Sequence, residues 1–208
     1  MFRSRSRPVV YPQAEHARVA AVIAAAWGEG RPPVPFESFV HGVALHDRGY
    51  GELDADGIGE TDDERWLEIQ RRGFSVQEND AVVELVVASH IHRLVSYGDS
   101  PARQAVARDF AAALPARRAA ANVTEAEAAA ADRITNLCDR ISFELCFEHD
   151  VEFSAAGYSC TATADGIATV DPWPLASPRL EVPAIGYESN GYPEVLRPVE
   201  RTFVVQPA

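Results

Sequence analysis

The chain has 208 residues, of which 47% are hydrophobic and 24% are charged, a composition typical of a globular protein with a substantial core. Its formal net charge of −12 excludes a general nucleic-acid surface, which requires basic patches that neutralise phosphates. The basic start of the sequence is not followed by an apolar signal core, and no apolar run approaches membrane-spanning length. We therefore expect a cytoplasmic protein that binds neither nucleic acid nor membrane.

The strong cations are all arginines, because the sequence contains no lysine. The three cysteines are an odd number without CxxC spacing, and they lie at Cys138, Cys146 and Cys160. The first two share one predicted helix, where their separation is too large for a comfortable disulfide. Free thiols that fill the core of a protein in a reducing compartment are the simplest interpretation.

The first predicted elements are an extended lead-in over residues 1–11 and a helix over residues 12–27. The apolar stripe of this helix includes Val19 and Ile23, and His16 falls on the same face. An imidazole on a buried face needs a polar partner. His16 is therefore a candidate site residue.

A second helix is predicted over residues 37–48, after a loop rich in glycine and proline. Val43 marks its inner face, and His46 and Asp47 continue that face. His41 points about 140° away from His46 on an ideal helix, so we expect it at the surface. The helix thus offers one histidine to the core and a second one to solvent.

Four more helices follow, at residues 66–72, 81–95, 101–114 and 125–148. The helix at 81–95 is apolar on all sides, as is typical of a central helix, and it carries His90 and His92. These two lie about 200° apart on an ideal helix, so they share one site only if the helix bends or ends there. We favour His90 as the inner residue. On the last helix, Asp139 lies at the edge of the apolar stripe.

The sequence changes character after His149. Asp165-Gly166 separates two short β-rich runs, which predicts a hairpin over residues 158–170. Two further strands are predicted at residues 180–185 and 201–205. We expect a mainly α protein, α+β overall.

Within it, residues 1–150 are predicted to form a helical bundle. Residues 151–208 are predicted to form a small β-rich C-terminal extension, packed on the same domain.

Four of the polar residues have the chemistry of a metal site. They would supply two imidazoles and two carboxylates from three helices, a donor set that divalent transition metals accept. The alternative is a set of unconnected residues: core histidines bonded to carbonyls, and aspartates that cap helices or pair with arginine. The four candidates are His16, His46, Asp47 and Asp139.

The order of these four residues resembles the H…HD…D pattern of the HD-domain superfamily, over roughly residues 10–148. The resemblance implies a helical bundle in which the quartet binds a metal ion, and water on that ion attacks a phosphate ester, with Asp47 as a catalytic residue. It implies one divalent ion (Mn, Fe, Co, Ni or Zn) and a small phosphorylated metabolite or nucleotide as substrate. A second ion is an alternative, in which His90 and His92 are further ligands.

A closer resemblance is to the bacterial domain-of-unknown-function family 3891, and it spans nearly the whole chain. It implies much about the fold and the site but little about the substrate. The segments that carry it are Tyr11-Pro12-Gln13-Ala14-Glu15-His16-Ala17, Ala26-Trp27-Gly28, His46-Asp47-Arg48-Gly49-Tyr50, Ser89-His90, Leu137-Cys138-Asp139-Arg140-Ile141-Ser142 and Pro172-Trp173-Pro174.

Substrate phosphate would be held by arginine, whose planar group binds phosphate through two parallel hydrogen bonds. The candidates are Arg48, Arg93 and Arg140, and Tyr50 is a candidate wall of the pocket. Two other functions remain open from the sequence: a di-iron oxygenase on the same scaffold, and a non-catalytic metal-binding or sensing protein. The oligomeric state is also open, with a homo-oligomer as one alternative.

Overall fold

The structure is a computed structural model that describes residues 1–28 and 30–208. Helix accounts for 47% and strand for 20% of the chain. The helices are α1 (Gln13–Ala25), α2 (Phe36–Ala44), the short 3-10 helix η1 (Arg48–Tyr50), α3 (Asp63–Ser75), α4 (Ala81–Ser96), α5 (Pro101–Ala121) and α6 (Glu125–Phe147). The strands are β1 (Phe2–Arg3), β2 (Val9–Tyr11), β3 (Val151–Ala155), β4 (Tyr158–Ala162), β5 (Ile167–Asp171), β6 (Leu180–Glu188) and β7 (Pro198–Pro207).

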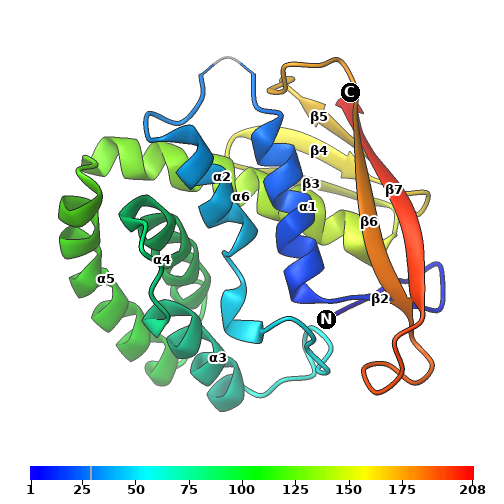
Figure 1. The fold of residues 1–208 in the computed structure, drawn as a ribbon, viewed down its shortest axis with the longest axis horizontal. Coiled ribbons are helices and arrows are strands. Elements are labelled where there is room, and N and C mark those ends of the chain that lie inside the picture. The colour runs from blue at the N-terminus through cyan, green and yellow to red at the C-terminus, as the bar shows by residue number, and fades with distance from the viewer. Residues whose placement is uncertain (29) are drawn as a thin grey trace.

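The strands form one mixed sheet in the order β1-β2-β6-β7-β5-β4-β3. The neighbours are antiparallel except β5 and β7, which are parallel. Figure 1 shows the sheet on one side of α1 and α6, with α3, α4 and α5 on the other side. The main core lies between the sheet and α1, α2 and α6, and a second apolar cluster joins α3, α4 and α5.

The prediction of a mainly α bundle with a small β-rich C-terminal extension is therefore wrong. The N-terminal strand β2 pairs with β6, so strands from both ends of the chain build one large sheet. Three consecutive buried residues, Val9 to Tyr11, form β2. A run this short shows no alternation, and for that reason it could not be distinguished from an extended lead-in.

Two helix ends also differ from the predicted ones. α2 ends at Ala44, so His46 and Asp47 lie in the turn after the helix rather than on its inner face. α5 continues through Pro115 and ends only before Asn122, which adopts a left-handed conformation with φ 52°. In the described residues, no helix combines the length and the hydropathy needed to cross a membrane.

Candidate metal centre

Five buried ionisable side chains converge where α1, α4 and α6 meet the turn after α2. The three histidines are no more than 1% exposed, and the two aspartates are 9% exposed. A charged or polar cluster this deep needs partners for its charges and hydrogen-bonding atoms. The five residues are His16 of α1, His46 and Asp47 of the turn, His90 of α4 and Asp139 of α6.

The turn that carries His46 and Asp47 is held by a close backbone contact. Gly49 of η1 packs directly against α3, where a Cβ atom on it would overlap the carbonyl oxygen of Ile69 and crowd Gly73. Only glycine lets the two backbones approach so closely. This contact fixes the turn against α3.

The ring nitrogens of His16 and His46 lie at the centre of the cluster. Their Nε2 atoms are 3.2 Å apart. The Nε2 of His16 is 3.1 Å from Oδ1 of Asp139 and 3.6 Å from Oδ2 of Asp47. His46 has similar distances, 3.6 Å to Asp139 and 3.5 Å to Asp47. Each of the two carboxylates thus approaches both imidazoles.

Hydrogen bonds at the far side of each ring set the tautomers. The Nδ1 of His46 donates to the carbonyl oxygen of Val43 at 2.6 Å. Ser142 donates its hydroxyl proton to the carbonyl oxygen of Asp139 at 2.9 Å, so its oxygen accepts from Nδ1 of His16 at 2.8 Å. Both Nδ1 atoms therefore carry the proton of the neutral ring, and both Nε2 atoms present a lone pair.

Two lone pairs that face each other at 3.2 Å repel unless a cation lies between them. That cation is either a proton on His46 or a metal ion. Ligands within 4.8 Å of one another can share an ion, and this criterion groups His16 with His46 and Asp47, and His46 with His90 and Asp139. The donor set is one that divalent transition metals accept.

The electrostatics of the cluster also favour a cation. Burial lowers the pKa of His46, but Asp47 and Asp139 outweigh burial and raise it to about 9. Burial raises the pKa of both carboxyl groups, but the neighbouring histidines outweigh it: His46 first for Asp47, and His90 first for Asp139. The net result lowers the pKa of Asp47 and places that of Asp139 well below its usual range. Both carboxylates are thus charged at neutral pH.

His90 has a different environment from the other two histidines. Arg93 donates from Nη2 to Nδ1 of His90 at 3.0 Å, because a guanidinium cannot accept. The neutral ring then carries its proton on Nε2, which lies 3.4 Å from Oδ1 of Asp47. Burial and the charge of His46 lower the pKa of His90. His90 therefore contacts both aspartates, but the lone pair of its neutral ring is already occupied by Arg93.

A pocket of about 460 Å³ opens onto the cluster. This volume suits a small molecule. Polar and aromatic side chains form its wall, among them Tyr50, Trp66, Tyr97, Asn136 and Arg140.

The substrate-binding candidates occupy different positions. Arg140 lines this pocket, is half-exposed and pairs with Glu144. Arg93 also lines it, but its guanidinium already bonds Asp132, Asn136 and His90. Tyr50 lines the pocket as predicted.

Arg48 and His92 are not brought to the pocket. Arg48 turns away from the neighbouring Asp47 and pairs with the buried Glu84 at 2.7 Å. His92 is half-buried on another side of α4, with Nε2 3.5 Å from the hydroxyl of Ser96. The 200° separation of His90 and His92 is thus not overcome by a bend in α4. His41 is exposed, as predicted.

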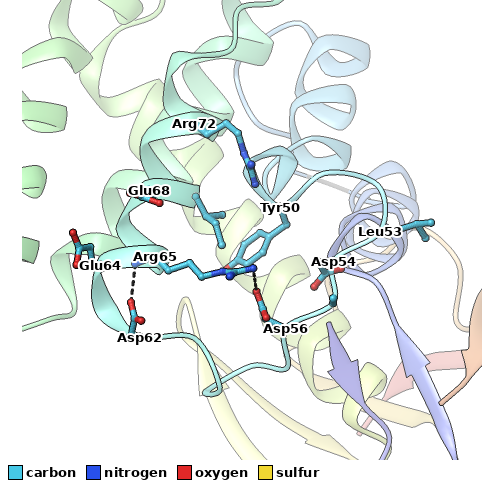
Figure 2. A pocket seen from close by; sticks show the side chains of 11 residues that line it. Tyr50, Leu53, Asp54, Asp56, Asp62, Glu64, Arg65, Glu68 and Arg72 are labelled. Atoms are coloured by element: carbon cyan, nitrogen blue, oxygen red, sulfur yellow. Dashed lines mark hydrogen bonds and ion pairs between the residues drawn. The ribbon is translucent and has the colours of Figure 1, made fainter. Parts of the chain in front are cut away.

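A second pocket, of about 690 Å³, shares Tyr50 with the first. Figure 2 shows Arg65 reaching Asp56, with which it pairs at 2.6 Å. Arg72 donates to the carbonyl oxygen of Gly49 at 2.6 Å. Acidic side chains outnumber these two arginines in the lining. This second pocket is therefore poorly suited to an anion.

Sequence reasoning missed two contributors to the site. Ser142 lies one turn after Asp139 on α6, and this spacing was the available signal for it. Gln13 lies one turn before His16 on α1 and lines the pocket. Its position at the start of a helix gave no sign of that role.

The sequence of the chain was compared with models of known protein families, and one family matches. Residues 3–187 match the model described as protein of unknown function (DUF3891). The chain belongs to this family. The range matched by DUF3891 includes all five residues of the cluster, from His16 to Asp139. The comparisons with curated proteins and with solved structures found no match.

Proposed function

We propose that this DUF3891 protein is a metal-dependent hydrolase of small phosphate esters, with one divalent ion held by His16, His46, Asp47 and Asp139. The observation that carries the proposal is the pair of Nε2 lone pairs 3.2 Å apart, flanked by two ionised carboxylates. We further propose that the quartet corresponds to the H…HD…D set of the HD-domain superfamily.

The surroundings of the quartet support a resident ion. Metal-binding histidines usually donate their other ring N–H to an oxygen, which fixes the ring and makes it a better ligand. The carbonyl of Val43 and the hydroxyl of Ser142 have this role for His46 and His16. A divalent transition metal bound there would lower the pKa of a water molecule and polarise a phosphoryl oxygen.

Arg140 is the residue that we assign to the phosphoryl group. It lines the pocket and is half-exposed, so one edge of its guanidinium can leave Glu144 for an anion. Arg93 has a different role, because its donors are used within the protein. It orients His90, and it approaches Oδ2 of Asp139 at 3.6 Å.

The contacts of His90 and His92 favour hydrolysis over the chemistry of a di-iron oxygenase. A second iron would need further histidine ligands, and His92 lies away from the pocket. The lone pair of neutral His90 accepts a hydrogen bond from Arg93. One ion with an open pocket beside it is what a hydrolytic site needs.

The test combines elemental analysis with a panel of phosphate esters assayed in the presence of Mn²⁺, Co²⁺ or Fe²⁺. We expect the protein to bind one ion per chain and to release phosphate from at least one ester. Asp47→Asn should reduce the rate more than a hundredfold, whereas His41→Ala, in the exposed part of α2, should leave it unchanged. An absence of Asp47-dependent phosphate release from every ester would contradict the proposal.

A further inference from the structure

Gln13 is the first residue of α1 and lies three positions before His16, on the same face of the helix. Both residues line the metal-site pocket. The side chain of Gln13 is deeply buried, and the residue is only 4% exposed. Its backbone N–H donates to Oδ1 of Asp54 at 2.8 Å. This bond fixes the start of α1, and with it the backbone of Gln13, beside the pocket.

The carboxamide of Gln13 lacks a partner. Its Oε1 is buried and forms no hydrogen bond with any residue among 1–28 and 30–208. A buried acceptor left without a donor destabilises a protein, so such atoms are usually satisfied by water or a ligand. His90 Nε2 is also without a hydrogen-bond partner, but its proton faces the carboxylate of Asp47 at 3.4 Å. Gln13 therefore requires a different partner.

The chemistry of an amide oxygen limits what that partner can be. Oε1 only accepts hydrogen bonds, and ionised phosphoryl oxygens also only accept, so a phosphate group cannot satisfy it. A hydroxyl group can donate to Oε1 and can also accept from Nε2. The last torsion of a glutamine side chain is soft, so either end of the amide can turn toward the pocket.

We propose that Gln13 binds a hydroxyl group of the substrate, and that the substrate is a hydroxylated phosphate ester of the polyol-phosphate or sugar-phosphate class. The phosphate part of this inference rests on the proposed function, in which Arg140 and the ion hold the phosphoryl group. The hydroxyl part rests on Gln13 alone. The pocket of about 460 Å³ has room for a ligand of this size.

The experiment uses phosphonates, whose carbon–phosphorus bond this hydrolysis does not cleave, so that binding is measured separately from turnover. Isothermal titration of the Mn²⁺-loaded protein compares 2-hydroxyethylphosphonate with ethylphosphonate, which differ by one hydroxyl group. We expect the hydroxylated probe to bind about tenfold more tightly, the effect of one hydrogen bond between neutral groups. In Gln13→Met this preference should disappear.

Gln104→Met is the matched control, because Gln104 is exposed on α5. It should retain the preference. The melting temperature of the metal-free Gln13→Met protein should be unchanged or higher, because an unpartnered buried amide has been removed.

Failure of 2-hydroxyethylphosphonate to bind, equal binding of the two phosphonates, or a preference that survives in Gln13→Met would overturn the inference. A large fall in melting temperature with the preference intact would instead show a structural role for Gln13, and would also overturn it. If the preference depends on Gln13 but no ester is hydrolysed, the inference stands and the proposed reaction falls.

Discussion

Ser142 and His16 are joined by a hydrogen bond of 2.8 Å, and the same serine hydroxyl donates to the backbone of Asp139. One hydroxyl thus connects two of the proposed ligands from two helices. It does so without occupying the lone pair on Nε2 of His16, which faces His46.

Removal of this hydroxyl should weaken metal binding. We expect Ser142→Ala to reduce the affinity for Mn²⁺ or Zn²⁺ about 10- to 100-fold, as is common for residues that orient a ligand, while the protein remains folded. Competition with a chromogenic chelator measures the affinity. Ser154→Ala, at the exposed rim of the same pocket, is the control and should bind metal like the wild type. Equal affinities for all three proteins would exclude this role of Ser142.

Metal binding should become tighter as the pH rises. The pKa of His46 is raised to about 9, so at neutral pH its ring is protonated in the metal-free protein, and the ion must displace that proton. We expect affinity to increase up to about tenfold per pH unit between pH 7 and 9, and to level off above pH 9. Titrations at several pH values, in buffers with different ionisation enthalpies, also count the protons released. An affinity that is constant over this range would contradict the assignment of His46 as a ligand.

Removal of the ion should lower the melting temperature, because an ion that binds only the folded state stabilises that state. At a free metal concentration 1,000 times the dissociation constant, binding stabilises the folded state by about 4 kcal/mol. For a chain of this size we expect a melting temperature about 8–16 °C lower after chelation. His46→Ala should lose this metal-dependent shift, whereas His41→Ala should keep it. A shift that persists in His46→Ala would place the ion elsewhere.

Glu84 should stabilise the fold in a pH-dependent way. Arg48 and Arg117 both pair with this buried carboxylate. Burial raises the pKa of Glu84, but Arg48, the backbone N–H of Glu78 and Arg117 outweigh it and lower the pKa below 4.5. Ionised Glu84, with its two arginines, therefore stabilises the protein above pH 4.5, and this stabilisation is lost as the pH falls through the lowered pKa of Glu84.

The corresponding variant is Glu84→Gln, measured by urea unfolding. At pH 7 we expect a loss of about 2–4 kcal/mol in the free energy of unfolding, because two arginines lose a buried partner. Near pH 3 the difference from the wild type should be smaller. A difference that does not change with pH would mean that packing, not charge, determines the contribution of Glu84.

The sequence predicted the helices well because their signals are local. Apolar periodicity located α6 and, with it, Asp139, and the structure shows that a capping box at Thr124 starts this helix. The separation of His90 from His92 on α4 also followed from helix geometry. Arg48 could not be placed in the same way, because its partner Glu84 lies 36 residues away and no local pattern connects them.

The sheet was predicted only in part for a similar reason. The hairpin of β4 and β5 has a turn signal at Asp165-Gly166, whereas β1 and β2 are too short to show alternation. The need of Gln13 for a partner is visible only in three dimensions, because it is defined by the contacts that its side chain lacks. The sequence thus predicted the side chains that converge in the buried cluster, but it could not predict the surroundings that distinguish one from another.

The pairing of β2 with β6 has a consequence for how the protein is made. Val9 pairs with Glu188, so the strand that leads into α1 finds its neighbour only after most of the chain has been synthesised. Contacts between such distant segments make folding slow, because a long loop must close before they form. A ribosome-bound chain that already contains all five site residues would still lack β6 and β7. His16, at the start of α1, would then reach its final position only after β6 has formed.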